Sequence, residues 1–361
     1  MATRHRRLFE LLGDKVDAVV LMNATEPNLD QSFFYVTGLT SGLFEDCVAI
    51  VRPRSVEVLS SSLEETSARK AGVKVTVFRR RADLGTLLKK KLRGYGAIGL
   101  NFKEITHANF RFISRCAKGT RVVDVSDQIR KARMVKDEDE IARIAKACRI
   151  VSKVAEDIPD LLSAGDTETH AAAEINYAMM MAGAEGAAFE TNASFGPATA
   201  EPHHVPGARR LRRGQLALFD FGAVYRRYVS DITRTFICGS PGAKHLRMYE
   251  VVSEAQTAAI DALRGGVKSR DVDAAAREVI DRSEFKGRFI HGTGHGLGIS
   301  VHDPGAISMH VDEVLEPGMV VTVEPGVYIK GLGGIRIEDD VLVTRDGGRV
   351  LTNASKELRR I

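Results

Sequence analysis

Two carboxylates stand in segments that otherwise alternate like buried β-strands. Asp220 lies between two phenylalanines, and Asp231 follows a run of alternating apolar and polar residues. An unpaired charge inside a protein costs on the order of several kcal/mol, so each acid requires a partner of opposite charge. A turn near Tyr225 and Arg226 folds the segment into a hairpin and places both acids on one face. Two carboxylates that close need a cation between them.

Three further candidate ligands follow, each in an apolar or glycine-rich setting. His295 lies in the run HGTGHGLG, Glu324 follows MVVTV, and Glu338 follows IRI. Each alone is weak evidence, because a lone acid on a strand is usually a surface residue or half of an ion pair. Together, four carboxylates and one imidazole form an oxygen-rich site of the kind that binds two divalent ions rather than one tetrahedral zinc. The four negative charges would balance two dications.

The positive charge of the chain is confined to its N-terminal part. The net charge is +5, yet residues 1 to 131 carry 23 Lys and Arg against 14 Asp and Glu, which leaves the remainder negative. The basic runs Arg4–Arg7, Arg79–Arg81 and Lys89–Arg93 lack interleaved aromatic residues, and the chain has no Trp. This pattern is typical of a solvated face rather than of a nucleic-acid site. We therefore expect no nucleic-acid partner.

The apolar runs and the cysteines indicate a soluble cytoplasmic protein. Apolar runs such as residues 17–22 and 318–323 have the length of strands and are too short to cross a bilayer. The N-terminus is interrupted by charged residues and lacks the apolar core of a signal peptide. The cysteines are widely scattered, which predicts four free thiols in a reducing compartment. No membrane partner is expected.

The periodicity of the chain changes near residue 130. Before that point, strand-like runs alternate with helix-like runs, which predicts a compact α/β unit. After it, a helix begins with a cluster of acids and continues with Ile141, Ile144 and Cys148 at helical spacing. Two more helices are predicted within residues 166–184 and 245–266, with strands between and after them. The sequence thus predicts an α+β protein with domains at 1–128 and 129–361.

The candidate ligands resemble a known set. They are separated by 11, 64, 29 and 14 residues in the order Asp220, Asp231, His295, Glu324 and Glu338. This order, with the motifs SDITRT, HGTGHGLG, EPG and GGIRIED, resembles the metal-dependent pita-bread peptidases. The run QSFFYVTGL (Gln31–Leu39) is similar to the creatinase/prolidase N-terminal domain. The resemblance implies a C-terminal pita-bread (creatinase/aminopeptidase) catalytic domain preceded by a smaller α/β creatinase-type domain.

The resemblance also implies a role for each ligand. Asp220 would bind one metal ion, His295 and Glu324 the other, and Asp231 and Glu338 would bridge the pair. Two such ions activate a water as the nucleophile and polarise the scissile carbonyl. Glu324 would in addition carry a proton to the leaving nitrogen. Mn, Co, Fe and Zn all suit these ligands, so the sequence does not identify the metal.

Further residues are implied around the metals. His203 and His302 would hydrogen-bond the substrate or the tetrahedral intermediate, and His291 would line the substrate pocket. His203 is chosen over the adjacent His204 by its spacing of 17 residues to the first acid. Arg336 would hold the nearby bridging glutamate in place. The alternatives are structural histidines and a surface arginine.

The resemblance implies hydrolysis of Xaa-Pro bonds. Such a bond is a tertiary amide without an N–H, so peptidases that bind substrate through that hydrogen bond cannot use it. A dinuclear site needs only the carbonyl and the free amine. Methionine aminopeptidase normally lacks an N-terminal domain of this kind, and creatinase has lost the ligands present here. The remaining choices are Xaa-Pro dipeptidase (prolidase) and aminopeptidase P.

We favour the Xaa-Pro dipeptidase, with aminopeptidase P as the alternative. Prolidases of this size often carry an arginine a few residues after the histidine that aligns with His302, and Ala306 stands there. The expected partners are a proline-containing di- or oligopeptide and a second copy of the chain in a homodimer. A non-catalytic binding protein on the same fold is a third choice. Such relatives have generally lost ligands, and all five are present here.

Overall fold

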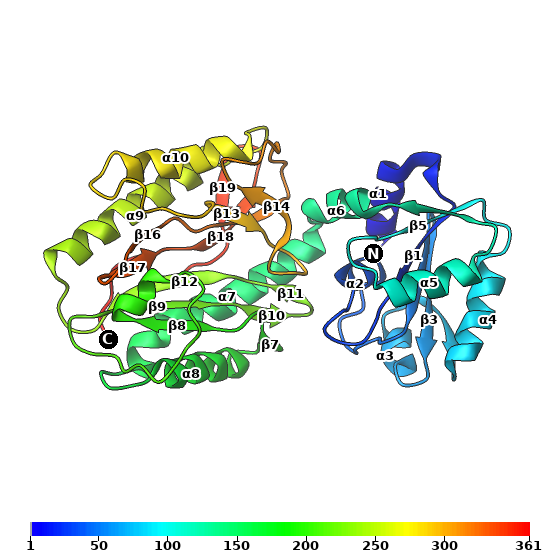
Figure 1. Ribbon diagram of the computed structural model, residues 1–361, viewed down its shortest axis with the longest axis horizontal. Helices are drawn as coiled ribbons and strands as arrows, with labels where there is room; N and C mark the ends of the chain where they lie inside the picture. Colours follow the sequence, from blue (N-terminus) through cyan, green and yellow to red (C-terminus); the bar gives the residue numbers. More distant parts are fainter. Residues whose placement is uncertain (1) are drawn as a thin grey trace. The chain divides into compact units, whose positions relative to one another are not determined.

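The computed structural model describes residues 2–361 and divides into two compact units, Met1–Arg133 and Met134–Ile361 (Figure 1). The sequence places the boundary a few residues earlier, between residues 128 and 129. That point lies inside helix α6 (Ser126–Met134), and the division between the two units lies before the last residue of this helix. Helices and strands are mixed in both units, as the α+β prediction requires.

The first unit is built on a six-stranded sheet with the order β4-β3-β2-β1-β5-β6. Its strands are β1 (Ala18–Met22), β2 (Val48–Arg52), β3 (Ser55–Ser61), β4 (Lys74–Phe78), β5 (Ala97–Leu100) and β6 (Arg121–Asp124). Its helices are α1 (Ala2–Leu12), the short η1 (Gly13–Lys15), α2 (Gln31–Thr37), α3 (Glu65–Lys70), α4 (Arg81–Leu92), α5 (His107–Cys116) and α6. Every residue of β1 and β5 is buried. The predicted α/β alternation is therefore confirmed.

The second unit places its helices in two pairs on either side of its sheets (Figure 1). The long helix α7 (Glu138–Leu161) begins with a capping box, in which the Asp137 carboxylate accepts from the Glu140 backbone N–H at 2.9 Å. Helices α7 and α8 (Glu168–Met181) pack against one set of strands. Helices α9 (Ala243–Ala262) and α10 (Ser269–Asp281) pack against the other. The sequence prediction included all of these helices except α10.

The strands of the second unit form several small sheets, of which three matter for the site: β12-β9-β8, β14-β13-β15-β18-β19 and β16-β17. The strands are β7 (Gly186–Ala187), β8 (Asn192–Phe195), β9 (Leu216–Phe221), β10 (Ala223–Tyr225), β11 (Tyr228–Val229), β12 (Ile232–Ile237), β13 (Gly294–Gly296), β14 (Asp303–Ile307), β15 (Val320–Val323), β16 (Gly326–Ile329), β17 (Gly333–Arg336), β18 (Asp339–Val343) and β19 (Gly348–Val350). A short 3-10 helix, η2 (Gly196–Ala200), follows β8. One apolar core lies under α7 and α8 and another under α9 and α10.

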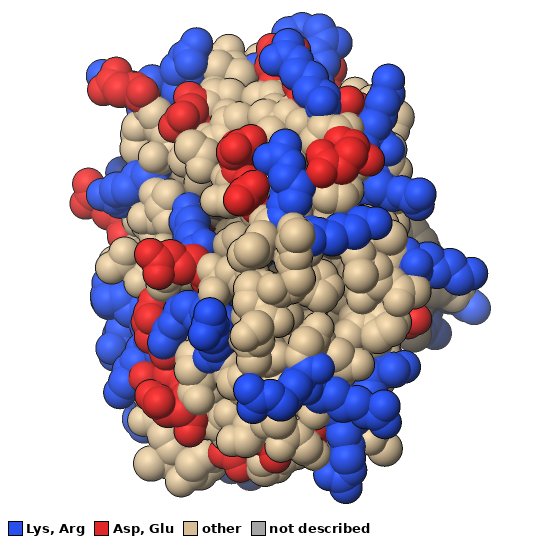
Figure 2. Space-filling model, turned by 90° about the vertical axis from the view of Figure 1, so that its left-hand side faces the viewer, with Lys and Arg blue, Asp and Glu red and all other residues tan. Residues whose placement is uncertain are grey.

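Charges of both signs are interspersed on the surface of the second unit. On the face that Figure 2 shows, Lys and Arg side chains lie beside Asp and Glu side chains around a central area of other residues. In the described part of the chain, no helix is both long and apolar enough to span a membrane. All four cysteines are buried free thiols.

Candidate metal centre

Strand β9 occupies the middle of the sheet β12-β9-β8 and carries Asp220 on the face away from the apolar core. Its neighbours Phe219 and Phe221 are fully buried in the core of α7 and α8, because alternate residues of a strand point to opposite faces. Asp220 is paired in register with Asn192 of β8 and with Thr233 of β12. These three residues form one row across the sheet.

Asp231 lies on the same face but is not directly opposite Asp220. The hairpin turns at Arg226 and Arg227, whose φ angles are 47° and 68°, and the register places Tyr225 opposite Tyr228. This turn is one residue later than the sequence suggests. Asp231 is therefore two positions before the residue that faces Asp220, which makes the two acids diagonal neighbours.

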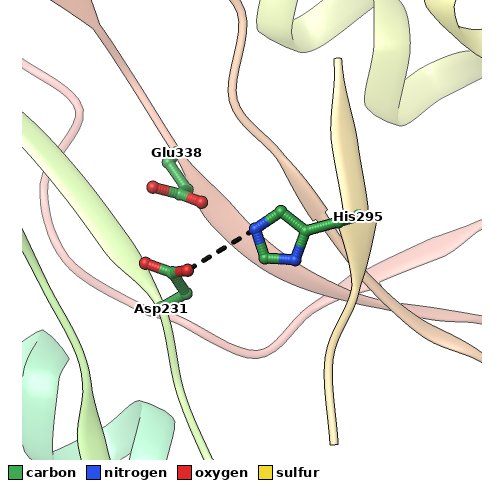
Figure 3. A group of neighbouring side chains, drawn as sticks. All are labelled: Asp231, His295 and Glu338. Atoms are coloured by element: carbon green, nitrogen blue, oxygen red, sulfur yellow. Dashed lines mark ion pairs between the residues drawn. The ribbon is translucent and has the colours of Figure 1, made fainter. Parts of the chain in front are cut away.

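Asp231 meets two residues from the second half of the unit (Figure 3). His295 comes from β13 and Glu338 precedes β18. One ligand atom from each of the three residues lies within 4.8 Å of the others. The His295 Nε2 atom is 3.7 Å from an Asp231 carboxylate oxygen. Three segments spread over more than 100 residues of the chain thus bring an imidazole and two carboxylates together.

Glu324 and Asp220 complete the set that the sequence predicts. The Glu324 Oε1 atom lies 3.6 Å from His295 Nε2, so Glu324 approaches the same nitrogen as Asp231. Asp220 lines the same cavity and forms an ion pair of 2.5 Å with Arg336. All five predicted ligands therefore line one cavity. Their roles as ligands stay a prediction.

The acids of this cluster raise one another's pKa values. Burial, and then the charges of Glu338 and Asp220, hold the pKa of Asp231 well above its usual range. Burial, and then Glu324 and Asp220, do the same to the pKa of Glu338. Burial raises the pKa of Glu324 to about 7, although the nearby Arg336 lowers it. The site is thus poor in positive charge and suits a bound cation.

Two further observations fit a metal ion. Oδ1 of Asp220 and Oδ1 of Asp231 are both buried, and neither accepts a hydrogen bond from the residues that the structure describes. The Nδ1 atom of His295 faces the Gly296 carbonyl at 3.1 Å, so this nitrogen carries the proton. The lone pair of His295 then lies on Nε2, the nitrogen that faces the carboxylates. This donor set is the one that a divalent ion requires.

Several hydrogen bonds orient the acids. Thr233 donates to Glu338 at 2.6 Å, and the Asp231 backbone N–H donates to Asp340 at 2.9 Å. The sequence predicts that Arg336 holds Glu338. Its guanidinium instead pairs with Asp220 and donates to Thr233 at 3.0 Å, so it reaches Glu338 only through that hydroxyl. The buried Arg336 thus contacts Asp220 directly and Glu338 only through Thr233.

The five predicted ligands line a cavity of about 1040 Å³ that also contains the predicted histidines. The ring of His302 lies 4.4 Å from that of His295, edge to face. Burial, and then the neighbouring His295, lower the pKa of His302. His302 precedes β14, which is held by a buried ion pair of 3.3 Å between Asp303 and Lys136. His203 also lines the cavity.

Two other histidines of the cavity are already engaged. The Nδ1 atom of His291 faces the Gly292 carbonyl at 2.7 Å, and its Nε2 atom faces the Tyr328 hydroxyl at 2.8 Å. Burial, and then Arg336, lower the pKa of His291 to about 4. The Nε2 atom of His204 lies 2.9 Å from the buried carboxylate of Glu168. His291 is therefore a neutral wall residue, and His204 anchors the loop that carries the preceding histidine.

Comparison with known proteins agrees with this architecture. Residues 142–345 match the description "Metallopeptidase family M24", and residues 4–135 match "Creatinase/Prolidase N-terminal domain". The first match covers more than half of the chain. The chain belongs to metallopeptidase family M24. The pita-bread fold and the creatinase-type N-terminal domain expected from the sequence are thus confirmed.

Relatives of this M24 chain match it over nearly its whole length. A Xaa-Pro dipeptidase from Pyrococcus horikoshii is 33% identical, with 99% of each chain covered. The crystal structure of an X-Pro aminopeptidase from Thermotoga maritima has a TM-score of 0.92 at 32% identity and covers 98% of this chain and 100% of that one. The crystal structure of the prolidase from Pyrococcus horikoshii has a TM-score of 0.89 at 32% identity and covers 98% and 99%. The chain is therefore similar both to a protein named Xaa-Pro dipeptidase and to one named X-Pro aminopeptidase, the two activities between which the sequence does not decide.

Sequence reasoning missed several polar residues of the M24 site. Tyr328 joins His291 to Arg336, whose guanidinium donates to its hydroxyl at 3.1 Å. Asp340 receives the Asp231 backbone N–H, and Asn192 faces Asp220 across the sheet. Tyr328 stands four residues after Glu324 on a glycine-bounded strand, which is a usable signal. Nothing in the sequence around Asn192 marks it as a cavity residue.

Proposed function

We propose that this chain is a metal-dependent peptidase that hydrolyses Xaa-Pro bonds, and that its main activity is that of an Xaa-Pro dipeptidase. The observation that carries the proposal is the convergence of four carboxylates and one imidazole on a single cavity, where buried oxygens of Asp220 and Asp231 accept no hydrogen bond from the described residues. Relatives over the full length of the chain bear the names Xaa-Pro dipeptidase and X-Pro aminopeptidase, which supports this choice of substrate.

The five residues would hold two divalent ions. We assign Asp220 to one ion, His295 and Glu324 to the other, and Asp231 and Glu338 to a position between them. Two ions, when bound, supply an activated water and polarise the scissile carbonyl. Mn, Co, Fe and Zn all suit carboxylate and imidazole donors, so the identity of the metal depends on supply and geometry.

The remaining groups handle protons and the substrate. We assign proton transfer to Glu324, whose carboxylate accepts from Thr322 at 3.3 Å at the edge of the cavity. The lowered pKa of His302 keeps its imidazole neutral near pH 7, so it can donate one N–H to a carbonyl or a developing oxyanion. His203 lines the cavity and has the same role in our assignment. His291 contributes the side of its ring, because both of its nitrogens are engaged.

The choice between dipeptide and longer substrates depends on what binds the carboxylate after proline. Ala306 lies on β14 directly opposite His295, so it is close to the site but offers no charge. Of the described residues that line the cavity, Arg336 is the only Arg or Lys, and it is paired with Asp220. A carboxylate gains most from a charged donor, so weak preference for dipeptides is expected here. Aminopeptidase P activity is accordingly the second candidate.

Metal dependence is tested on the purified protein. We expect two divalent ions per chain by elemental analysis and loss of hydrolysis after chelation, with recovery when ions are returned.

Substrate specificity is tested on the metal-loaded protein. It should cleave Ala-Pro and, measurably, Ala-Pro-Ala, and should leave Ala-Ala-Ala nearly intact. Full activity in a verified metal-free sample contradicts the metal assignment, and rapid cleavage of Ala-Ala-Ala contradicts the proline specificity.

Two further parts of the proposal concern the cellular location and the oligomeric state of the protein. We infer a cytoplasmic location, which the four buried free thiols support, and a homodimer without nucleic-acid or membrane partners. Sedimentation of the purified protein tests the dimer, and a labelled chain in intact cells tests the location.

A further inference from the structure

Asn192 offers the cavity a hydrogen-bond acceptor that the protein does not use. It is the first residue of β8, is 6% exposed and lines the cavity. Its Nδ2 atom donates to the Pro202 carbonyl at 3.1 Å. Because a carbonyl can only accept, this contact identifies the amide nitrogen and therefore the position of the amide oxygen. The Oδ1 atom is buried and accepts no hydrogen bond from any residue that the structure describes. A buried acceptor left in this state costs about 1–3 kcal/mol.

The residue opposite Asn192 in the sheet and the residue two positions before it in the chain are acids, which can only accept when ionised. Asp220 pairs with Asn192 across the β8–β9 ladder, and its own Oδ1 atom is buried without a donor. Glu190, two residues before Asn192, also lines the cavity. We call these three residues the acceptor wall. A ligand that satisfies this wall must bring donors, and a group that carries positive charge satisfies it best.

Apart from the acids assigned to the metal ions, the rest of the cavity differs from this wall in its chemistry. The lining includes the imidazoles of His203 and His302, which suit carbonyl and carboxylate oxygens. A peptide substrate with a free N-terminus has one group made only of N–H donors, its α-amino group. The chemistry of the acceptor wall matches that group and no other part of an Xaa-Pro peptide.

We propose that the Asn192 amide oxygen accepts a hydrogen bond from the free α-amino group of the substrate, beside Asp220. Asn192 is then a specificity residue that makes the enzyme require an unblocked N-terminus. This inference rests on the proposed Xaa-Pro peptidase function and adds the residue that recognises the amine. An amide oxygen is also a ligand for hard cations, so binding of a metal ion by Asn192 is the rival role to be tested.

The experiment compares two ligands that differ only in the amine. Ala-Pro and propionyl-proline compete with Met-Pro for the metal-loaded enzyme, and the ratio of their inhibition constants measures how well the amine is recognised. Asn192→Leu removes both the acceptor and the donor to Pro202, whereas Asn192→Asp removes the donor, keeps an acceptor and adds a negative charge. A preference that is lost in the Leu variant and kept in the Asp variant therefore depends on the acceptor. Ser194→Ala is the control, because Ser194 lies on the same strand, donates to the Leu218 carbonyl and is not among the cavity residues.

We expect Asn192→Leu to reduce the preference for Ala-Pro over propionyl-proline about tenfold or more, as loss of a hydrogen bond to a charged group does. Asn192→Asp should keep or increase the preference, because its carboxylate also accepts from the amine. Ser194→Ala should keep the preference within about twofold of wild type, and the metal content should be unchanged in all variants. Should Asn192→Leu fail to fold, Asn192→Ala replaces it.

Three results overturn the inference: an unchanged preference in the Leu variant, an equal loss in the Leu and Asp variants, or a loss of bound metal in the Leu variant. If wild type fails to cleave Met-Pro at all, the proposed function fails instead. The two failures are therefore distinguishable.

Discussion

Glu338 and Asp339 are adjacent in the chain and equally buried, yet their surroundings are opposite. Asp339 has an exposed fraction of 0% and forms ion pairs with Arg234 at 2.8 Å and Lys356 at 2.6 Å. Burial raises the pKa of Asp339, but these two cations outweigh burial and hold it below its usual range. Glu338 faces other acids, and burial together with Glu324 holds its pKa well above its usual range.

The difference separates structural from functional charge. Neighbouring residues of an extended chain point to opposite faces, so one acid reaches the cations of the protein and the other reaches the cavity. Asp339 also accepts from Gln256 at 2.8 Å, which completes a buried network that holds the C-terminal segment around Lys356. A buried acid with its countercharge in the chain stabilises the fold. A buried acid among other acids indicates a countercharge from outside the chain.

The largest expected effect is on the cavity side of this comparison. Glu338→Ala and Asp231→Ala should each reduce kcat/KM for Ala-Pro by roughly a thousandfold or more, because loss of a bridging ligand removes several kcal/mol of transition-state stabilisation. The fold should survive, since the remaining acids repel one another less. Steady-state kinetics with thermal unfolding of the same samples checks both statements. Near wild-type turnover in both variants contradicts the assigned geometry.

The other side of the comparison should respond in stability. Asp339→Ala leaves the fully buried Arg234 with its charge unpaired, and removing one partner of a buried pair costs about 3–5 kcal/mol. Urea unfolding of the metal-free protein measures this difference. The matched control is Glu278→Ala, which removes an exposed partner of Arg282 and should cost under about 1 kcal/mol. If the two variants are equally stable, the Asp339 network does not have the structural role given to it.

Much of the fold could be predicted because apolar spacing follows the helix and strand periods. Ile144, Cys148 and Val151 recur along α7, and the capping residues mark its start. Helix α10 was missed although Val272 and Ala276 have helical spacing, because it begins without a side-chain cap to mark its start. The turn register was one residue off because two arginines occupy left-handed positions that usually hold Asn or Gly.

The sequence predicts those residues of the site whose side chains need a partner wherever they are buried, but not the contacts between them. Buried acids and their order along the chain led to the cavity, since burial of an acid demands compensation. The partner of Arg336 was not predictable, because its choice between Asp220 and Glu338 depends on how β17 lies against β9. Asn192 was overlooked for the same reason, since its role depends on a contact with Pro202. Sequence shows which groups need partners, and packing decides which partners they have.

The acids of the cavity should also make the metal-free protein sensitive to pH. For an acid whose folded pKa is raised, the native state binds more protons than the unfolded state, so stability falls as pH rises from the unfolded pKa to the folded one. For Glu324 this window runs from its ordinary 4.5 to about 7. The lowered pKa values of His291 and His302 act in the opposite sense below their ordinary 6.5. Thermal unfolding between about pH 6.5 and 8 should therefore show Tm falling by a few degrees without metal.

Added metal should remove this dependence, because metal ions bind the deprotonated ligands. The Glu338→Ala variant should show a weaker fall in Tm, since one of the mutually repelling acids is gone. A Tm of the metal-free wild type that rises steadily from about pH 6.5 to 8 would contradict the raised pKa values. Tm curves of the two proteins, with and without added ions, measure all of this in one experiment.

The smallest expected effect is on substrate preference, when a positively charged side chain is introduced at position 306 beside the cavity. Ala306→Arg puts a guanidinium opposite His295, where it can meet the carboxylate that follows proline in a dipeptide but only an amide in a tripeptide. We expect the ratio of kcat/KM for Ala-Pro over Ala-Pro-Ala to rise roughly tenfold. Ala306→Gln, which is long and polar but uncharged, is the control and should leave the ratio nearly unchanged. If the arginine instead lowers the metal content, it has paired with the acids of the cavity. The positive charge that these acids otherwise take from metal ions then comes from the chain itself. If the wild type already ignores the tripeptide, another cation holds the carboxylate and the interpretation of Ala306 is wrong.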